Sequence, residues 1–565
     1  MRLTPTADTL FYGDNLAIMR EHLQDESVDL VYLDPPFNSN ANYNVLFRSP
    51  TGEHSRAQID AFEDTWHWDE SAERAFDEVV MGPNSDAAEM LRAMRSALRE
   101  NDLMAYLAMM AVRLLELHRV LKPTGSLYLH CDPTASHYLK LILDAIFGSR
   151  NYRSELSWRR SSAHNDVKQG RKSYGNVRDV IFFYSKGMIW TWNGGFTPYD
   201  ESYLDSFYRF TEPGSRRRYR LGDLTAAKPG GDVSYPWQIR RRLGEGWSAD
   251  LDVEWKSPQP GWEYGTARPY RGRFWAFSRD NMTKFAEAGR LAYSRGGMLS
   301  YKRYLDEMPG VPLQNDWQDI RPATGAQSTG YPTQKPVALL ERIVRASSNE
   351  GDLVLDPFCG CGTTVHAAEK LNRRWIGIDI THLAIGLVNK RLTEAFPLAE
   401  FEIQGAPRDL AGARELAAAD KHQFQLWALS LIDAQPFRGG RKGADGGIDG
   451  FLYFKTSART TEKAVVSVKG GSCSVSHVRE LIATVDREGA RLGIFVTLEP
   501  PTAAMRREAV AANFYRTEHG SFPKVQLLTV ADILDGARPQ TPWLDRSVFR
   551  QTRREGTTQQ GELGI

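Results

Sequence analysis

The sequence predicts an α/β fold with a parallel sheet, shared among about three domains. Short buried strands alternate with helices in separate stretches of the chain. A glycine-rich turn joins one of these strands directly to a helix, an arrangement found where doubly wound sheets bind ligands. The chain has 565 residues, which is too long for one hydrophobic core at about 100–200 residues per domain.

The first alternating stretch lies in the N-terminal quarter of the chain. Residues 28–34 have the pattern of a buried strand that ends at a Pro-Pro turn. Residues 103–121 carry apolar side chains at helical spacing, and a Lys-Pro-Thr-Gly turn at 122–125 leads into a strand at 126–130. A further helix is expected at about 135–147. This alternation indicates a parallel sheet.

The same alternation returns near residue 340. A helix at 338–346 precedes a strand at 353–356, a glycine-rich turn opens a helix at 363–371, and a strand follows at 375–379. A third α/β stretch occupies about 412–536. The chain therefore combines two sheet-forming segments with a separate C-terminal module.

The composition excludes several classes of protein. A charged fraction of 25% beside 41% hydrophobic residues excludes disorder throughout. No apolar run of about 18 residues is present, so we expect no membrane span, and the N-terminus lacks the pattern of a signal segment. The four cysteines are too few and too scattered for a disulfide framework, and we expect a reduced cytoplasm.

The net charge of +1 conceals a strong local imbalance. Residues 1–150 carry 13 basic and 23 acidic residues, whereas residues 151–330 carry 28 basic and 20 acidic residues. The middle block also holds nine of the 14 tryptophans and 13 of the 22 tyrosines. Arginines neutralise phosphates and fork onto guanine edges, while aromatic rings stack on bases, so this block suits a nucleic-acid surface.

We predict that three arginine clusters in this block contact nucleic acid. A single charge run usually only faces water, so a solvated, loop-rich insertion is the alternative. Three clusters within one aromatic-rich block favour binding. The candidate residues are Arg216, Arg217, Arg218, Arg240, Arg241, Arg242, Arg271 and Arg273.

The glycine-rich turn predicts half of a cofactor site. It reads Asp356-Pro-Phe-Cys-Gly-Cys-Gly362 and lies between a buried strand and a helix, where glycine allows close backbone approach to a ligand. Asp379 ends the next strand, where an acidic residue can bind both ribose hydroxyls. A turn that serves only helix packing is the alternative.

Two further motifs connect this turn to a known family. Asp34-Pro35-Pro36-Phe37 follows a strand end, and Tyr331-Pro-Thr-Gln-Lys-Pro336 precedes the glycine motif. Together the three motifs resemble the β group of S-adenosylmethionine-dependent DNA amino-methyltransferases, which includes type III modification subunits. The resemblance covers about residues 10–400 and implies a Rossmann-like fold with a circularly permuted motif order and an inserted target-recognition region. It also implies a bacterial or archaeal protein associated with the nucleoid.

The resemblance assigns cofactor contacts residue by residue. The methionine part of the cofactor would lie on the glycine turn beneath the Thr333–Lys335 segment, Asp379 would hold the ribose, and Asp14 would lie near the adenine. Lys335 could instead be a solvated loop lysine, and Asp14 could instead cap a helix at 16–23. The implied set is Asp14, Thr333, Lys335, Asp356, Phe358, Gly360, Gly362 and Asp379.

The turn at Asp34–Phe37 suits methylation of an exocyclic amine. The lone pair of such an amine is delocalised into the base, and two acceptors on its N–H groups free it. Asp34 supplies a carboxylate and Pro35 a carbonyl without a competing N–H, while Pro36 completes the turn and Phe37 can stack on a flipped base. No metal is needed.

The target base is predicted to be adenine. The family's N4-cytosine members more often have Ser in the first motif position, so Asp34 favours N6-adenine and leaves N4-cytosine as the alternative. C5-cytosine methylation requires a Pro-Cys nucleophile, and none of the four cysteines follows a proline. Trp158 and residues 180–186 resemble the segment that walls the flipped-base pocket, although both could be plain core.

The C-terminal stretch resembles the Mrr-like branch of the PD-(D/E)xK nuclease fold. Asp449 and Lys469 match that pattern. Ser467 stands where the branch has Glu or Gln, and Gln425 stands where it often has Glu. Asp445 could be only a turn residue. Loss of carboxylates weakens a Mg²⁺ site. Three interpretations of this stretch therefore remain. It could cleave DNA with Mg²⁺ bound to Asp449, it could be a DNA-binding or regulatory remnant of the nuclease fold, or it could have a different fold.

These observations predict five segments and a set of partners. Residues 1–150 and 331–405 form the catalytic and cofactor-binding halves of the methyltransferase, 151–330 the target-recognition region, 406–540 the nuclease-fold domain and 541–565 a flexible tail. Double-stranded DNA is the expected substrate, and no membrane partner is expected. A homodimer, a separate restriction subunit and a fused enzyme that also cleaves DNA are further hypotheses, and a non-catalytic reader is the alternative to an enzyme.

Overall fold

The computed structural model describes residues 4–36, 43–46, 58–62, 67–161, 172, 174–228, 234–252, 258–323, 334–437, 447–456 and 460–542. The chain divides into two compact units, and the smaller one is an insertion formed by residues 195–313. The larger unit contains the methyltransferase-like sheet and the C-terminal module. Among the residues described, no helix is long and apolar enough to cross a membrane.

A nine-stranded sheet forms the centre of the larger unit, in the order β19-β6-β7-β5-β2-β20-β21-β1-β22. Neighbouring strands are parallel except for β7, which runs antiparallel to both β5 and β6. The α/β expectation is confirmed, but the sheet is mixed rather than wholly parallel because β6 and β7 lie side by side without a crossover helix. The strands are β1 (Asp8–Tyr12), β2 (Val28–Leu33), β5 (Leu121–Cys131), β6 (Tyr152–Arg159), β7 (Arg178–Ser185), β19 (Asp316–Trp317), β20 (Leu353–Asp356), β21 (Arg374–Asp379) and β22 (Phe401–Gln404).

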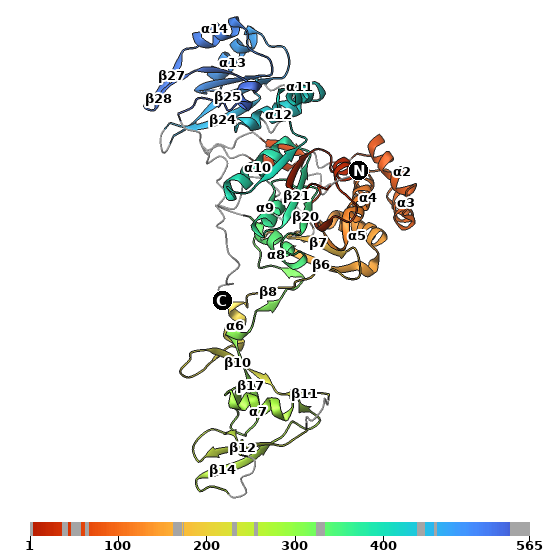
Figure 1. Cartoon of the computed structure of the whole chain (residues 1–565), viewed down its shortest axis with the longest axis vertical. Helices are drawn as coiled ribbons and strands as arrows, with labels where there is room; N and C mark the ends of the chain where they lie inside the picture. The colour runs from red at the N-terminus through yellow and green to blue at the C-terminus, as the bar shows by residue number, and fades with distance from the viewer. Residues whose placement is uncertain are drawn as a thin grey trace. The chain divides into compact units, whose positions relative to one another are not determined.

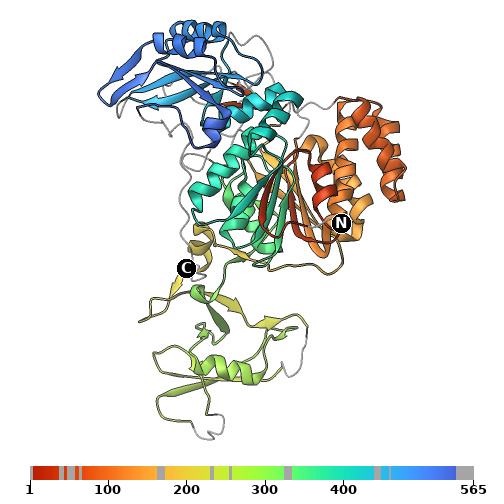
Figure 2. The same ribbon diagram turned by 45° about the horizontal axis from the view of Figure 1, so that its top comes forward.

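Helices pack on both faces of this sheet (Figures 1 and 2). One face carries α1 (Asn15–His22), α4 (Asp102–Val120) and α5 (Pro133–Phe147), and α2 (Glu70–Val80) and α3 (Ser85–Leu98) pack on α4 and α5 as an outer layer. The other carries α8 (Val337–Ser347), α9 (Thr363–Lys370) and α10 (His382–Ala395). The helices expected at 103–121, 135–147, 338–346 and 363–371 are confirmed. The sequence interpretation missed α2 and α3, and a two-stranded sheet of β3 (Tyr43–Leu46) and β4 (Gln58–Phe62).

One predicted turn is wrong. Residues 122–125 lie inside β5, not before it, and the pairing with β2 shifts there: Val28 faces Leu121, whereas Leu30 faces Ser126. The Pro-Thr-Gly sequence therefore forms an irregularity within a longer strand.

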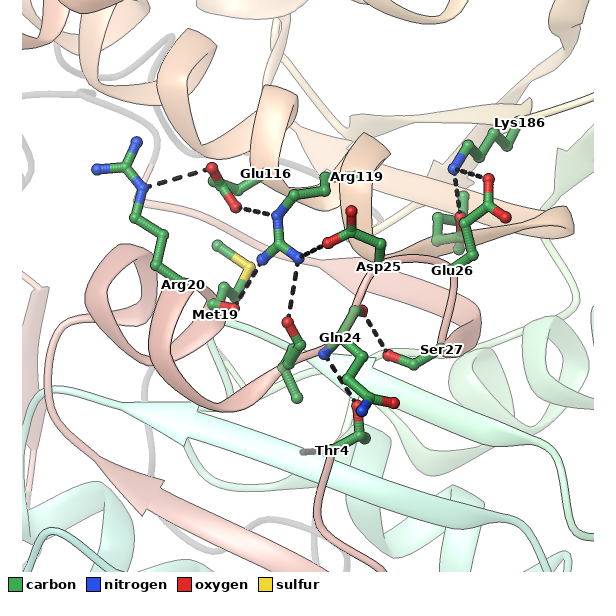
Figure 3. A network of polar contacts seen from close by, with 12 residues as sticks. Thr4, Met19, Arg20, Gln24, Asp25, Glu26, Ser27, Glu116, Arg119 and Lys186 are labelled. Atoms are coloured by element: carbon green, nitrogen blue, oxygen red, sulfur yellow. Dashed lines mark hydrogen bonds and ion pairs between the residues drawn. The ribbon is translucent and has the colours of Figure 1, made fainter. Parts of the chain in front are cut away.

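Arg119, in the last turn of α4, fixes the end of α1 (Figure 3). Its guanidinium donates to the carbonyl oxygens of Met19 at 2.8 Å and Leu23 at 3.0 Å, at the end of this helix, where carbonyl groups need partners from outside it. It also pairs with Glu116 at 2.6 Å and Asp25 at 2.5 Å. This network holds α1 against α4, and α1 begins beside the carboxyl end of β1.

The inserted unit is built from short antiparallel strands. Its core includes Trp237, Trp275 and Met282. The unit is narrower than the predicted region 151–330, because residues 152–159, 178–185 and 316–317 add strands to the large sheet. Its elements are β8 (Phe196–Thr197), α6 (Glu201–Phe207), β9 (Phe210–Thr211), β10 (Arg218–Asp223), β11 (Thr225–Ala226), β12 (Trp237–Arg242), β13 (Ser248–Ala249), β14 (Trp262–Ala267), β15 (Phe274–Trp275), α7 (Arg279–Glu287), β16 (Leu291–Tyr293), β17 (Leu299–Tyr304) and β18 (Val311–Pro312).

The C-terminal module has a five-stranded sheet in the order β23-β24-β25-β26-β29. Helices and strands occupy residues 410–534, which confirms the α/β stretch expected at about 412–536. The elements are α11 (Leu410–Ala419), α12 (Lys421–Leu431), β23 (Gln435–Pro436), β24 (Gly450–Lys455), β25 (Thr461–Lys469), α13 (Val475–Arg487), β26 (Leu492–Thr497), α14 (Ala503–Ala511), β27 (Phe514–Thr517), β28 (Gly520–Pro523), β29 (Val525–Thr529) and α15 (Val530–Leu534).

Candidate active site

The carboxyl edge of the large sheet gathers the acidic residues singled out in the sequence. Asp14 lies two residues beyond β1 and Asp34 follows β2, while Asp356 and Asp379 end β20 and β21. These four strands are parallel, so their carboxyl ends meet at one edge. Ligands of open α/β sheets bind at that edge.

Asp34 forms an ion pair with Lys335 that is largely shielded from water. The Lys335 Nζ contacts Asp34 Oδ2, and the two side chains are only 10% and 17% exposed. The other carboxylate oxygen, Oδ1, is buried and has no hydrogen-bond partner among the described residues. Lys335 is thus not the solvated lysine of the alternative interpretation. Phe37 and Thr333 lie outside the described residues, whereas Pro35 and Pro36 are described and follow Asp34 directly.

The glycine turn shapes the start of α9 and lets it pack closely on α10. Gly360 and Gly362 have φ of +52° and +73°, in the left-handed region that favours glycine. A Cβ on Gly362 would lie 2.8 Å from a methyl carbon of Val388. The Gly360 N–H donates to Asp379 Oδ2 at 2.9 Å, which ties this turn to the end of β21.

Burial disfavours the charged form of the Asp356 and Asp379 carboxylates. It raises the pKa of Asp356 to about 7, the hydrogen bonds from Thr364 and Phe358 oppose the rise, and the charges of Asp34 and Asp379 add to it. Burial likewise raises the pKa of Asp379, against the hydrogen bonds it accepts from Thr381 and Gly360. A buried acidic site of this kind stabilises a cation. The residues present therefore fit a positively charged cofactor with ribose hydroxyls, such as a sulfonium nucleoside.

Asp14 caps α1, as the alternative interpretation expected. Its Oδ1 accepts from the Ala17 N–H at 3.0 Å, and its Oδ2 pairs with the buried Arg113 at 2.7 Å. Arg113 also donates to Asn15 Oδ1 at 2.7 Å, and the Asn15 amide donates to the Pro357 carbonyl at 2.8 Å. The cofactor-side role of Asp14 stays a prediction. Sequence reasoning missed Arg113 and Asn15, although Arg113 is the one charged residue in the apolar stretch 103–115.

A second set of bonds joins the glycine turn to the Lys335 segment. The Thr363 hydroxyl donates to the Lys335 carbonyl at 3.2 Å. Arg391, buried on α10, donates to the Thr363 hydroxyl at 3.1 Å and to the Cys361 carbonyl at 3.0 Å. The segment that pairs with Asp34 is therefore held by the turn predicted to bind the cofactor.

Further polar residues lie beneath Asp34. His130 on β5 contacts the hydroxyl of Tyr32 and the carboxylate of Asp179, both on neighbouring strands. Trp158 is buried, its indole N–H donates to the Ile320 carbonyl at 2.9 Å, and its ring meets His130 edge-on at 5.8 Å. Residues 180–185 belong to β7, and the role of this wall in base binding stays a prediction.

Most of the predicted DNA-binding arginines are ion-paired within the inserted unit. Arg217, Arg218, Arg240, Arg241 and Arg273 each contact a carboxylate of that unit. Arg242 packs near the Trp262 ring at 5.2 Å. Arg216 and Arg271 are exposed and form no ion pair among the described residues. Their DNA contacts stay predictions.

The C-terminal site brings Asp449 together with uncharged donors. Asp449 is buried, its Oδ1 accepts from the Gln425 amide, and its Oδ2 accepts from the Ser467 hydroxyl at 3.1 Å and the Val468 N–H at 2.6 Å. Lys469 is the last residue of β25, the strand that also carries Ser467 and Val468. Asp445 lies outside the described residues. Over the part of the chain described here, no three His, Cys, Asp or Glu side chains are grouped to hold a metal ion.

Two family models match the chain. A model described as DNA methylase matches residues 28–390, and one described as NACHT-associated inactive restriction endonuclease 1 matches residues 421–535. Each match coincides with one of the two sites above. The C-terminal module is therefore restriction endonuclease-like, as the sequence predicts.

The chain is similar to two curated proteins and to one solved structure. The type II methyltransferase M.EcaI of Enterobacter cloacae is 29% identical over 387 residues, which cover 68% of this chain and 69% of that protein. The Mod subunit of the type III restriction-modification enzyme StyLTI of Salmonella typhimurium is 26% identical over 64% of this chain, but only 49% of that subunit is covered. The solved PvuII DNA methyltransferase (cytosine-N4-specific) is 12% identical, with 72% of this chain and 98% of that chain covered and a TM-score of 0.30.

Proposed function

This chain belongs to the DNA methylase family, of the type that methylates exocyclic N6 or N4 amines, and we propose that it methylates N6 of a flipped adenine in double-stranded DNA. S-adenosylmethionine is the proposed donor. When bound, it supplies an activated methyl group on a sulfonium. The chain's own residues bind it, orient the base and accept the amine's hydrogens.

The observation that carries this proposal is the free oxygen of Asp34. Its Oδ1 is buried without a hydrogen-bond partner among the described residues, whereas Lys335 occupies Oδ2. A buried acceptor in this state destabilises the protein until a donor arrives. An exocyclic N–H is such a donor, and the Pro35 carbonyl would accept the second one. Two acceptors localise the nitrogen lone pair, and fixed orientation then supplies much of the rate.

We propose that the acidic turn holds the cofactor. Asp356, Phe358, Gly360 and Gly362 would line its methionine part and Asp379 its ribose. The raised pKa of Asp356, caused mainly by burial, supports a cationic ligand at this position. Removing a base from the duplex costs a few kcal/mol, and the predicted stacking on Phe37 would offset part of it.

The direct test is nucleoside analysis after reaction. The full chain, labelled S-adenosylmethionine and duplex DNA of mixed sequence should yield labelled N6-methyladenine. Asp34→Ala should abolish the product. Asp29→Ala is the matched control, because Asp29 lies on the same strand and pairs with Lys122 at 2.8 Å away from the carboxyl edge. Labelled N4-methylcytosine would instead support the alternative target, and equal activity of both variants would refute the role of Asp34.

We propose that the C-terminal module binds DNA or regulates the enzyme without cleaving DNA. The residues of its site do not fit Mg²⁺, since the oxygens of Asp449 are occupied by uncharged donors and Ser467 replaces a carboxylate or amide. The word "inactive" in the matching family description supports this. Unmethylated DNA incubated with Mg²⁺ or Mn²⁺ should stay intact. Cleavage that disappears in Asp449→Ala would refute the proposal in favour of a fused restriction-modification enzyme.

A separate restriction subunit is the proposed partner. The Salmonella relative is the Mod subunit of a type III restriction-modification enzyme, which supports a divided enzyme. Affinity purification of the tagged chain from its own host, followed by mass spectrometry, should recover such a subunit. A purified chain that sediments as a dimer would support the homodimer hypothesis.

A further inference from the structure

A buried chain of polar side chains leads away from the end of β2. The Tyr32 hydroxyl lies 2.9 Å from His130 Nδ1, and His130 Nε2 lies 3.1 Å from Asp179 Oδ2. The other oxygen of Asp179 lies 3.3 Å from Arg160, whose side chain is 34% exposed. Tyr32, His130 and Asp179 are almost completely buried and lie on β2, β5 and β7, which are adjacent in the sheet.

Hydrogen-bond chemistry fixes the donor at the Asp179 end of this chain. The Asp179 carboxylate only accepts, so His130 Nε2 carries a proton. His130 Nδ1 and the Tyr32 hydroxyl share the second hydrogen bond. Burial by itself would raise the pKa of Asp179, but the hydrogen bond and charge of His130 and the charges of Lys335 and Arg160 outweigh it and lower that pKa.

The chain is connected to the catalytic ion pair at two points. Tyr32 precedes Asp34 by two residues on the same strand. Lys335 contacts Asp34, and its charge also acts on Asp179. The charge of Lys335 therefore acts on the carboxylates of both Asp34 and Asp179.

Stability alone does not explain this arrangement. Tyr32 lies in an apolar cluster with Leu30, Ile181 and Val354. A phenylalanine would fit there and would bring no hydroxyl that needs a hydrogen-bond partner. A buried polar network is costly unless every member is satisfied, and when satisfied it fixes one geometry. The end of β2 is where a fixed geometry matters, since it positions Asp34.

We infer that Tyr32, His130 and Asp179 are positioning residues for methyl transfer. Their hydrogen-bonded chain holds the end of β2 so that the free oxygen of Asp34 meets the target amine. The inference rests on the proposed function of Asp34. Misplacement by about 1 Å can reduce a rate about 100-fold, so removing one link should lower kcat by about tenfold or more and leave cofactor binding unchanged.

The test compares two tyrosines that each lose one buried hydroxyl. Tyr32→Phe breaks the bond to His130, and the matched control Tyr128→Phe breaks the 2.7 Å bond between Tyr128 and Ser347 in the same cluster. Turnover on duplex DNA, the Kd for S-adenosylmethionine by calorimetry and chemical unfolding are measured for the full chain. We expect Tyr32→Phe to lower kcat about tenfold with cofactor Kd unchanged within about twofold, whereas Tyr128→Phe lowers only stability.

A second measurement does not depend on activity. Nitrogen NMR of imidazole-labelled protein should show the Nε2–H tautomer for His130, assigned with His130→Asn, and Asp179→Asn should change it. Equal kcat for the two phenylalanine variants, a loss confined to Kd or KM, or the opposite tautomer would overturn the inference. A wild-type protein that binds S-adenosylmethionine but methylates no DNA would refute the proposed function, and the tautomer would then decide whether the hydrogen-bonded chain exists.

Discussion

Replacing Asp356 by asparagine should make the protein less sensitive to pH. The Asp356 carboxylate is buried at the end of β20 and accepts hydrogen bonds from the Phe358 N–H, at 3.0 Å, and from Thr364. Burial raises its pKa from 3.8 to about 7, despite the opposing hydrogen bonds. Asparagine keeps an oxygen for the Phe358 N–H but has no charge to bury.

The sign follows from proton linkage. Between about pH 4 and pH 7 the folded chain holds a proton on Asp356 that the unfolded chain has released. The folded state binds more protons there, so the free energy of unfolding falls as pH rises through that interval. At about 1.4 kcal/mol per pKa unit, Asp356 should account for a loss of about 2–3 kcal/mol between pH 5 and pH 8.

Urea unfolding at pH 5, 6, 7 and 8, without cofactor, measures this effect. The stability of Asp356→Asn relative to the wild type should rise by about 2–3 kcal/mol across the series. Asp8, whose pKa is also raised mainly by burial, titrates in both proteins and cancels in the difference. Parallel stability curves for the two proteins would refute the buried-carboxylate reasoning.

Three further predictions concern single side chains. Lys335→Met should abolish methylation and cost about 3–5 kcal/mol of stability, because it leaves the largely shielded Asp34 carboxylate without its partner. If Lys335→Met lost less activity in methylation assays and less stability in urea than Lys335→Arg, this prediction would be contradicted. Gly362→Ala should destabilise the chain by about 1–3 kcal/mol and weaken S-adenosylmethionine binding in calorimetry, whereas Gly351→Ala, with similar φ but no atom within 4 Å, should cost less and leave binding unchanged. Arg119→Met should lower the urea midpoint by an amount equivalent to about 2 kcal/mol, whereas exposed Arg74→Met should not; equal midpoints would show that the network in Figure 3 adds no stability.

The sheet and its main helices could be predicted because each has a strong local pattern. The strand at 353–356, the glycine turn, the helix at 363–370 and the strand at 374–379 follow one another along the chain. The helix at 70–80 was missed although Ala72, Ala75, Phe76 and Val79 are buried at helical spacing, because acidic residues dominate its sequence. The strand at 180–186 was expected, but its antiparallel direction was not, because strand direction depends on tertiary pairing.

The candidate site divides in the same way. Asp34, Lys335, Asp356 and Asp379 lie in short motifs whose chemistry is local. Arg113 contacts Asn15 across 98 residues of sequence, and His130 contacts Asp179 across 49. Such pairs have no local pattern, and only the sheet order brings them together. Composition likewise could not show that Arg217 and Arg273 form ion pairs with carboxylates of the same unit.

The inserted unit begins and ends at a single two-stranded neck. Thr197 pairs with Val311, the Leu313 N–H donates to the Gly195 carbonyl at 3.0 Å, and a Cβ on Gly310 would lie 2.3 Å from the Thr197 oxygen. Because the neck brings the two ends together, the length of the insertion costs little in closure entropy. A different module could replace this unit on the same neck without altering the strand register of the nine-stranded sheet. The proposed DNA-reading unit and the methyltransferase sheet could therefore diversify independently.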